Sequence, residues 1–192
     1  MKQTYRNLHR YLGPILQFFF PVAIHGKENI PEGAAMVCAN HSSLLDPLLV
    51  ALAFGKQQHL HFMAKRELFG IPVIGKIIAN AEAFPVDRSS NDLGAVRTAM
   101  RYLKTACKVM LFPEGTRVSE DDAVAAKSGA IRLASRAKVP IVPVYVPRKK
   151  RMFRKTPIVI GKPYYIEQAG RDEFEALSGQ LMDKIYELKA ES

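Results

Sequence analysis

The chain has 192 residues, a length typical of one domain. Hydrophobic residues make up 48% of it and charged residues 24%, so it can bury a core, which excludes a disordered chain, a collagen and a disulfide-stapled miniprotein. Its 28 Lys and Arg against 18 Asp and Glu give a formal charge of +10, which favours anionic partners such as a phospholipid surface, a nucleic acid, an acidic carrier protein or a phosphorylated metabolite.

The first twenty residues predict a basic amphipathic helix, because no acidic residue precedes Glu28 and apolar side chains recur at helical spacing. The recurring apolar residues are Tyr5, Leu8, Leu12, Ile15 and Phe19. Three consecutive phenylalanines at 18–20 favour a helix lying in the headgroup layer of an anionic membrane over one that only docks on the protein body. The apolar stretch 11–24 is too interrupted to span a bilayer, so we expect a peripheral or monotopic protein on the cytoplasmic face of the cell membrane.

From residue 22 onward, short β-like runs alternate with helical patterns. Strands are predicted at 35–39, 61–64, 83–86, 109–112, 141–146 and 158–160, and helices at 44–54, 93–107, 125–137 and 174–188. Several of the strands are continuously apolar, which is typical of a sheet covered on both faces. The alternation predicts one α/β domain over residues 1–192, with a mostly parallel or mixed central sheet flanked by helices.

The cysteines and histidines predict neither a disulfide nor a metal site. Cys38 and Cys107 each lie in an apolar stretch and are expected to be buried thiols. His59 and His61 alternate on a predicted strand with no Cys or carboxylate cluster nearby, so we expect them to bind no zinc.

The first segment with chemical potential is Asn-His-Ser-Ser-Leu-Leu-Asp-Pro at 40–47, which follows a strand and opens a helix. Open α/β sheets place their ligands at such positions. On a continuous helix, residues five apart differ by about 140° around the axis, so His41 and Asp46 meet only if His41 lies in the loop and Asp46 in the first turn. Asp46 would then hold one imidazole nitrogen and leave the other as a general base. Taken alone, the motif fits a structural role equally well.

The second segment is Leu-Phe-Pro-Glu-Gly-Thr-Arg at 111–117, a strand that ends in a turn. Gly115 lets the backbone approach a ligand, Thr116 offers a hydroxyl and Arg117 a charged planar fork, so the turn can bind phosphate. Taken alone, it fits a surface turn with a salt bridge somewhat better.

Together the two segments, about seventy residues apart, resemble the glycerophospholipid acyltransferase family. Two further blocks resemble the family in its order: Lys-Arg-Glu-Leu at 65–68 followed by Phe-Pro-Val-Asp-Arg at 84–88, and Val-Pro-Ile-Val-Pro-Val at 139–144. The resemblance implies transfer of a fatty acyl group from acyl-CoA or acyl-ACP to the free hydroxyl of 1-acylglycerol 3-phosphate (lysophosphatidic acid), without a metal or other cofactor.

The resemblance also implies roles for individual residues. His41 would be the general base and Asp46 would orient it. The acceptor phosphate would be bound by Lys65, Arg88, Glu114, Gly115, Thr116 and Arg117.

Several alternatives stay open at this point. The acceptor could be glycerol 3-phosphate or another lysolipid. A basic membrane- or nucleic-acid-binding module would explain the charge but not the two segments, so no nucleic acid is expected. The basic run at 148–155 fits a solvated loop, a contact with anionic lipid or a contact with an acyl carrier protein, and less well a contact with nucleic acid. The apolar residues within 68–78 fit a lipid-facing surface or a buried core element.

Overall fold

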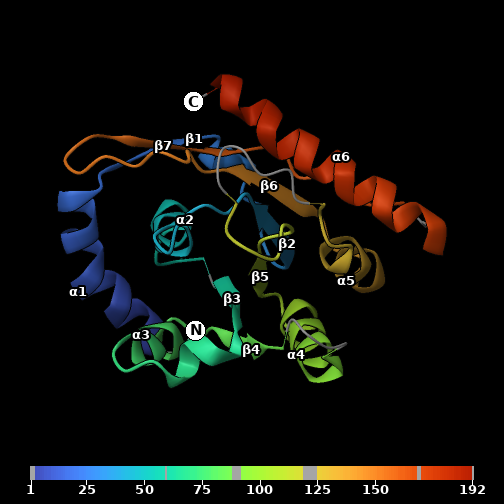
Figure 1. Ribbon diagram of the computed structural model, residues 1–192, viewed down its shortest axis with the longest axis horizontal. Coiled ribbons are helices and arrows are strands. Elements are labelled where there is room, and N and C mark those ends of the chain that lie inside the picture. The colour runs from blue at the N-terminus through green and yellow to red at the C-terminus, as the bar shows by residue number, and fades with distance from the viewer. Residues whose placement is uncertain (1–2, 59, 88–91, 119–124, 168–169, 192) are drawn as a thin grey trace.

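The computed structural model describes residues 3–58, 60–87, 92–118, 125–167 and 170–191 (Figure 1). Its helices are α1 (Gln3–Phe19), α2 (Asp46–Phe54), α3 (Ile74–Asn80), α4 (Leu93–Lys104), α5 (Gly129–Ala137) and α6 (Phe174–Glu187). Its strands are β1 (Val22–His25), β2 (Ala35–Ala39), β3 (Leu60–Lys65), β4 (Phe84–Val86), β5 (Lys108–Leu111), β6 (Ile141–Tyr145) and β7 (Thr156–Ile160). Short 3-10 turns cover Lys27–Asn29, Arg66–Gly70, Arg171–Glu173 and Leu188–Glu191.

The strands form one mixed sheet in the order β1-β7-β6-β2-β5-β3-β4, which confirms the predicted fold class. β6, β2, β5, β3 and β4 run parallel to one another, whereas β7 is antiparallel to β6 and β1 is parallel to β7. The five parallel strands therefore end at the same edge of the sheet. The loops that follow β2, β3, β5 and β6 meet there, and both segments singled out in the sequence belong to these loops.

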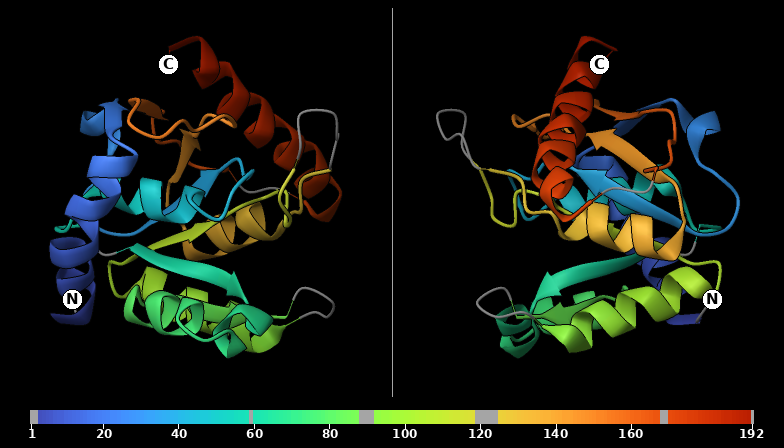
Figure 2. Two further views of the ribbon diagram at one scale, coloured as in Figure 1. Left: turned by 60° about the vertical axis from the view of Figure 1, so that its left-hand side comes forward. Right: turned by 90° about the vertical axis from the view of Figure 1, so that its right-hand side faces the viewer.

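Central strand β2 shows why several strands are apolar throughout. Its five residues are all buried, and their side chains alternate between two hydrophobic cores. Met36 and Cys38 pack with residues of α4, α5 and α6, whereas Ala35, Val37 and Ala39 pack with residues of α2. The sheet thus lies between two helical layers (Figure 2). Cys38 and Cys107 are buried thiols, as predicted.

Some elements differ from the sequence-based expectation. Edge strand β1 was not predicted, because only four half-exposed or exposed residues form it, and its pairing with distant β7 defines it. α3 occupies part of the apolar stretch 68–78. α2 begins two residues and α5 four residues later than predicted.

Helix α1 packs against α2 and α3 through one face and exposes apolar side chains on another. Tyr5, at the start of the predicted stripe, is fully buried, so the docking interpretation holds for this end of the helix. Tyr11, Ile15 and Phe18 instead form the outward stripe, with 68%, 54% and 67% of their surface exposed. Among the described helices, none is both long and apolar enough to cross a bilayer.

Candidate active site

The loop after β2 is fixed to the end of β6 before it reaches the first segment. The Asn40 side-chain amide donates a hydrogen bond to the Val146 carbonyl and accepts one from the Val146 amide, both at 2.8 Å. α2 then begins at Asp46, with Pro47 in its first turn, where a missing amide hydrogen costs nothing. His41 therefore lies in the loop and Asp46 at the helix start, as predicted.

This turn brings the two side chains together. His41 Nδ1 lies 3.0 Å from Asp46 Oδ2, which also accepts hydrogen bonds from the amides of Ser42 at 2.6 Å and Ser43 at 2.7 Å. An ionised carboxylate only accepts, so Nδ1 carries the hydrogen and Nε2 keeps a free lone pair. In the described ranges no hydrogen bond reaches Nε2. The imidazole thus has the orientation and tautomer of a general base.

The imidazole ring is also fixed from its flat side. It stacks on the Phe112 ring, with centroids 4.0 Å apart and planes inclined by 17°. His41 is only 9% exposed. The ring is therefore held by packing as well as by hydrogen bonds.

Lys150 completes the surroundings of Asp46. Its Nζ forms an ion pair with Asp46 Oδ1 and donates a hydrogen bond to Ser42 Oγ at 2.8 Å, and only 4% of the side chain is exposed. The sequence placed Lys150 in a basic run of solvated or ligand-facing residues. The structure corrects this for Lys150, whose side chain points inward and forms an ion pair with the buried carboxylate of Asp46.

The charge state of Asp46 follows from these contacts. Burial, the largest single influence, raises the pKa of Asp46 because it disfavours the ionised form. The hydrogen bonds from His41 and Lys150 and the positive charge of Lys150 outweigh burial, so the pKa of Asp46 lies below its ordinary value. Asp46 is therefore a carboxylate at neutral pH.

The second segment supports the first through Glu114, which is 3% exposed. Glu114 Oε2 accepts a hydrogen bond from the His41 amide at 2.7 Å, and Oε1 accepts one from the Tyr186 hydroxyl at 2.7 Å. Burial, and then the hydrogen bond to Glu114 and its charge, raise the pKa of Tyr186 to about 12, so the phenol stays protonated and donates. Arg148 in turn donates to the Tyr186 hydroxyl at 2.8 Å.

The rest of this turn faces outward. Gly115 has φ +69°, and a Cβ there would lie 2.8 Å from Cε of Lys127, so glycine fits both the backbone and the space. Thr116 and Arg117 are exposed. The next amide, that of Val118, donates to the His41 carbonyl at 2.9 Å, so Arg117 directly precedes a residue in contact with the His41 loop.

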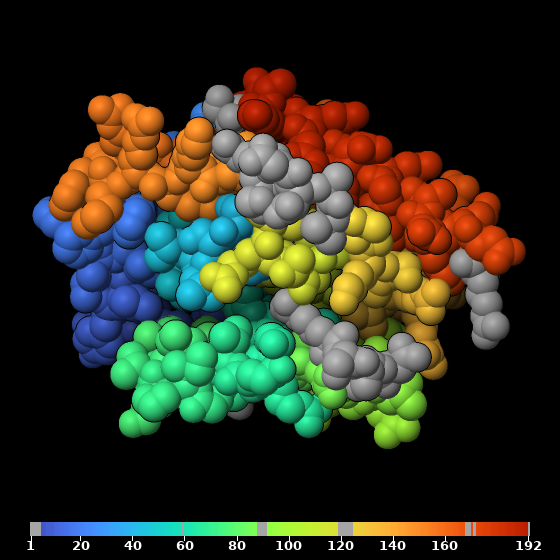
Figure 3. Space-filling model, viewed as in Figure 1, coloured from blue at the N-terminus to red at the C-terminus, as the bar shows by residue number. Residues whose placement is uncertain are grey.

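The remaining predicted phosphate ligands lie farther along the same edge or outside the described residues. Lys65 ends β3, is half exposed and forms an ion pair with Glu67 at 3.1 Å. β5 lies between β3 and β2, so two strand spacings, about 10 Å, separate the strand that ends at Lys65 from the strand that precedes His41. Arg88 falls outside the described residues. Figure 3 shows a furrow here, between the green surface that includes α3 and the cyan and yellow surfaces of α2 and the loop after β5.

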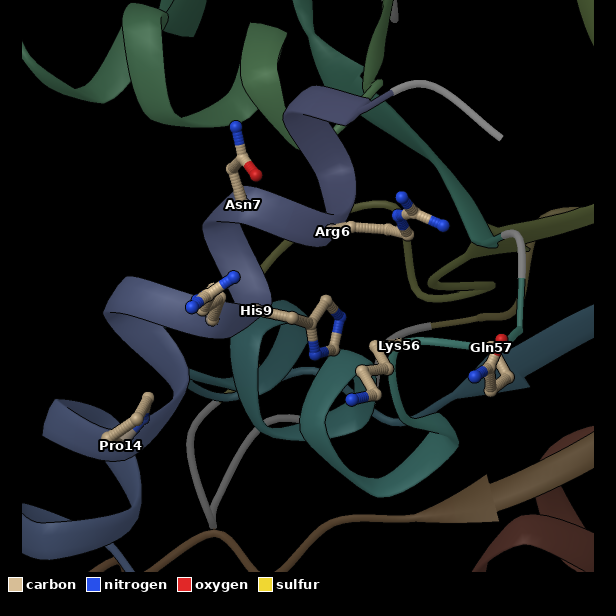
Figure 4. Close-up of a pocket in the computed structure, with 7 residues that line it drawn as sticks. Arg6, Asn7, His9, Pro14, Lys56 and Gln57 are labelled. Atoms are coloured by element: carbon tan, nitrogen blue, oxygen red, sulfur yellow. The ribbon is translucent and has the colours of Figure 1, made fainter.

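A separate cavity of about 470 Å³ lies between α1 and the chain just after α2 (Figure 4). Its lining includes Arg6 and His9 from α1 and Lys56 from the following loop. None of its lining residues belongs to the two segments. The residues of the two segments thus lie at the strand ends and not in this cavity.

Sequence reasoning missed Lys150, Tyr186 and the internal role of Glu114. Lys150 is one of six Lys and Arg residues at 148–155, and nothing in that run distinguishes it from the others. Tyr186 lies in a helix whose apolar spacing indicates only a packed face. These contacts join residues 72 to 108 positions apart. No local pattern carries that pairing.

The chain is similar to known proteins in both sequence and fold. A family model described as Acyltransferase matches residues 21–147. The chain is 32% identical over 195 residues to the 1-acyl-sn-glycerol-3-phosphate acyltransferase of Bacillus subtilis, and the alignment covers 96% of each chain. It is 29% identical over 186 residues to the enzyme of the same name from Saccharomyces cerevisiae, covering 87% of this chain and 60% of that one. The crystal structure of the 1-acyl-sn-glycerophosphate acyltransferase PlsC from Thermotoga maritima superposes with a TM-score of 0.72 at 27% identity, covering 97% of this chain and 80% of that one.

Proposed function

This chain belongs to the acyltransferase family, and from that premise we propose that it acylates 1-acylglycerol 3-phosphate to give phosphatidic acid. It is thus an enzyme of lipid synthesis, and its relatives act on the acceptor proposed here. The observation that carries the proposal is the His41–Asp46 pair, held at 3.0 Å beside the Arg117 turn at one edge of the sheet.

In the proposed reaction His41 Nε2 takes the proton of the acceptor hydroxyl as its oxygen attacks the thioester carbonyl carbon. Asp46 stabilises the imidazolium that forms and stays ionised itself. The tetrahedral intermediate then collapses, the carbon–sulfur bond breaks, and the thiolate takes the proton back from His41. A thioester is already activated, so positioning and proton transfer are the main tasks of the protein and no metal or other cofactor is required.

We propose that the acceptor phosphate lies against Thr116 and Arg117, with Lys65 and Arg88 closing the cradle from β3 and from the chain after β4. A phosphate monoester carries about two negative charges, which the planar guanidinium of Arg117 can meet with paired hydrogen bonds. Glu114, expected in this cradle, has both oxygens engaged internally. Its proposed role changes from phosphate contact to support of the turn.

We place the reaction on the cytoplasmic face of the cell membrane, with an anionic bilayer as partner and acyl-CoA or acyl-ACP as donor. The outward residues of α1 support this, because Tyr11, Ile15 and Phe18 give a surface helix an apolar stripe. The acceptor and the product are both lipids, so an enzyme at the interface meets them where they reside.

The test offers the purified protein lysophosphatidic acid, glycerol 3-phosphate and a neutral lysolipid, each with acyl-CoA and with acyl-ACP, and identifies products by mass spectrometry. We expect phosphatidic acid from the first acceptor and little product from the neutral lysolipid, because only the former carries the phosphate. Equal use of the neutral lysolipid would contradict the phosphate cradle. Acylation of glycerol 3-phosphate in preference to lysophosphatidic acid would contradict the proposed acceptor and make glycerol 3-phosphate the substrate.

A further inference from the structure

We propose that the loop joining β6 to β7, residues 146–155, inserts its tip into an anionic bilayer and positions the catalytic dyad through its base. Met152 and Phe153 form the tip, and Lys150, which holds Asp46, lies at the base. This inference rests on the proposed function, since the dyad serves acyl transfer to a membrane lipid.

The base of the loop reaches the dyad through one cation. Within the described ranges Asp46 Oδ1 has no hydrogen-bond donor apart from its ion pair with Lys150 Nζ. Lys150 also donates to Ser42 Oγ, and the Ser42 amide donates to the other Asp46 oxygen. A lysine that only kept the loop soluble would extend into water, because a buried ammonium loses its hydration. Lys150 is therefore a positioning residue for Asp46, and through it for His41.

The tip of the loop carries apolar side chains that the protein does not cover. Met152 is 52% exposed and Phe153 61% exposed. The Phe153 ring contacts the Phe18 and Phe19 rings of α1 with centroids 5.6 Å apart, and its amide donates to the Phe19 carbonyl at 2.7 Å. Figure 1 shows this loop beside the C-terminal end of α1. The tip thus continues the outward stripe of α1 into one apolar surface.

Phe153 occupies a backbone position that favours glycine. Its φ is +61°, inside a tight turn closed by the hydrogen bond from the Arg154 amide to the Arg151 carbonyl. A bulky side chain is uncommon in this left-handed region. Its ring fills no core and faces water over most of its surface. An exposed aromatic ring kept at such a position is consistent with use at the surface.

The charge of the loop selects an anionic bilayer as the partner. Six of the eight residues from 148 to 155 are Lys or Arg, and none is acidic. Arg148 and Lys150 turn inward, whereas Arg151, Arg154 and Lys155 are exposed around the apolar tip. Cations that meet lipid phosphates while apolar side chains enter below them are the pattern of interfacial binding. An acidic carrier protein would match the charge but not the bare apolar tip.

Only three positions separate Lys150 from Phe153. Contact of the tip with lipid and placement of Asp46 therefore depend on one short segment. This arrangement would place the dyad close to the bilayer that supplies its acceptor.

The test compares three variants of the full chain. Met152→Ser/Phe153→Gly removes the tip, and glycine suits the backbone at 153, so we expect an unchanged Tm. Lys150→Met removes the cation at Asp46, and Lys155→Met is its matched control, because it removes the same charge from an exposed position in the same loop. Each variant is measured for sedimentation with phosphatidylcholine vesicles, with or without phosphatidylglycerol, and for activity on vesicle-borne and on short-chain, monomeric lysophosphatidic acid.

The tip variant should lose about tenfold in binding to anionic vesicles and in activity on vesicle-borne acceptor, with activity on monomeric acceptor unchanged. Lys150→Met should lower kcat about tenfold or more on both acceptors with KM little changed, because dyad geometry acts on the chemical step. Lys150→Arg should restore part of the rate. Lys155→Met should leave kcat on the monomeric acceptor within about twofold, and should weaken binding to anionic vesicles by about fivefold, the effect of one cation near the membrane surface.

Unchanged sedimentation of the tip variant with anionic vesicles would overturn the proposal. A Lys150→Met variant with the same kcat as Lys155→Met would overturn it too. Loss of carrier-protein binding with vesicle binding intact would assign the tip to the carrier and overturn it as well. Two measurements need no turnover: sedimentation, and the ¹⁵N NMR signals of the His41 ring, which should change in Lys150→Met and not in Lys155→Met. If the wild-type protein transfers no acyl group, the proposed function fails while these two measurements still decide on the loop.

Discussion

The two halves of the proposed site are built differently. The half with the base is buried, and each oxygen of Asp46 and Glu114 has a partner within the protein. The half proposed to bind phosphate is open, since Thr116 and Arg117 are exposed and Lys65, itself half exposed, pairs with Glu67 in the same stretch of chain. The geometry of the base is thus fixed before substrate arrives, whereas exposed cations contribute little until a phosphate shields them from water.

Because the two halves differ in burial, mutations in each half should change a different kinetic constant. A group that acts in a buried, preorganised network affects the rate of the chemical step when it is removed. A group that acts on the bound substrate from an open surface affects mainly substrate affinity. Mutations in the two halves should therefore separate into kcat and KM effects.

His41→Ala should have the largest effect. Removing a general base costs typically about 10²–10⁴-fold in rate, and we expect a kcat loss in that range with an unchanged circular dichroism spectrum. The measurement is acyl transfer to lysophosphatidic acid under saturating donor and acceptor. Vesicle sedimentation of the same variant is the control and should not change. A variant with more than a tenth of the wild-type kcat would remove His41 from the chemistry.

Asp46→Asn should follow closely. The asparagine oxygen would turn to Lys150, so its NH₂ group would face the imidazole and favour the tautomer with hydrogen on Nε2, which cannot accept a proton. In a serine protease the corresponding change costs about 10⁴-fold, and we expect at least about 10²-fold here. The readout is kcat, with the ¹⁵N NMR signals of the His41 ring reporting the tautomer. Unchanged signals with a lowered kcat would show that Asp46 acts in some other way.

Arg117→Ala tests the open half of the site. We expect KM for lysophosphatidic acid to rise about 10- to 100-fold, the range of one or two charge-assisted hydrogen bonds, with a much smaller change in kcat. Arg136→Ala is the matched control, because Arg136 is an exposed arginine at the end of α5, which leads to the opposite edge of the sheet. An equal KM effect of both variants would mean that Arg117 contributes only general charge.

The last prediction concerns stability and not catalysis. Because the pKa of Asp46 is lowered in the folded state, its ionisation stabilises the fold above its unfolded pKa of about 3.9, and this contribution is lost as pH falls through the folded pKa. Wild type should therefore exceed Asp46→Asn by about 1.5–3 kcal/mol in free energy of unfolding at pH 7. The difference should shrink as pH falls below about 4. Urea denaturation between pH 3 and 7 measures it, and a difference independent of pH would exclude stabilisation by the carboxylate charge.

Local physics explains what the sequence could predict. β2 was predicted to the residue because a short, unbroken apolar run that ends at Asn40 is typical of a strand buried on both faces. The meeting of His41 and Asp46 was predicted because helix geometry forbids it on a continuous helix and permits it across a helix start. Both inferences depend on residues within six positions of each other.

The roles of Lys150 and Glu114 could not be predicted, because they depend on contacts between distant parts of the chain. The charge run at 148–155 gave no reason for Lys150 to differ from Lys155, yet one is buried on Asp46 and the other is exposed. Likewise, Glu114 occurs in a turn suited to phosphate, but its carboxylate is buried and accepts a hydrogen bond from the His41 amide. The strand order decides these pairings, and the sequence did not reveal that order.

The most direct test is a crystal structure of the protein with lysophosphatidic acid and a non-hydrolysable acyl thioester analogue. We predict that the free hydroxyl of the acceptor lies about 2.6–3.2 Å from His41 Nε2 while its phosphate contacts the Arg117 guanidinium. An acceptor bound with its phosphate elsewhere, such as in the cavity between α1 and the chain after α2, or with its hydroxyl out of reach of His41, would contradict a single site that serves both ends of the headgroup.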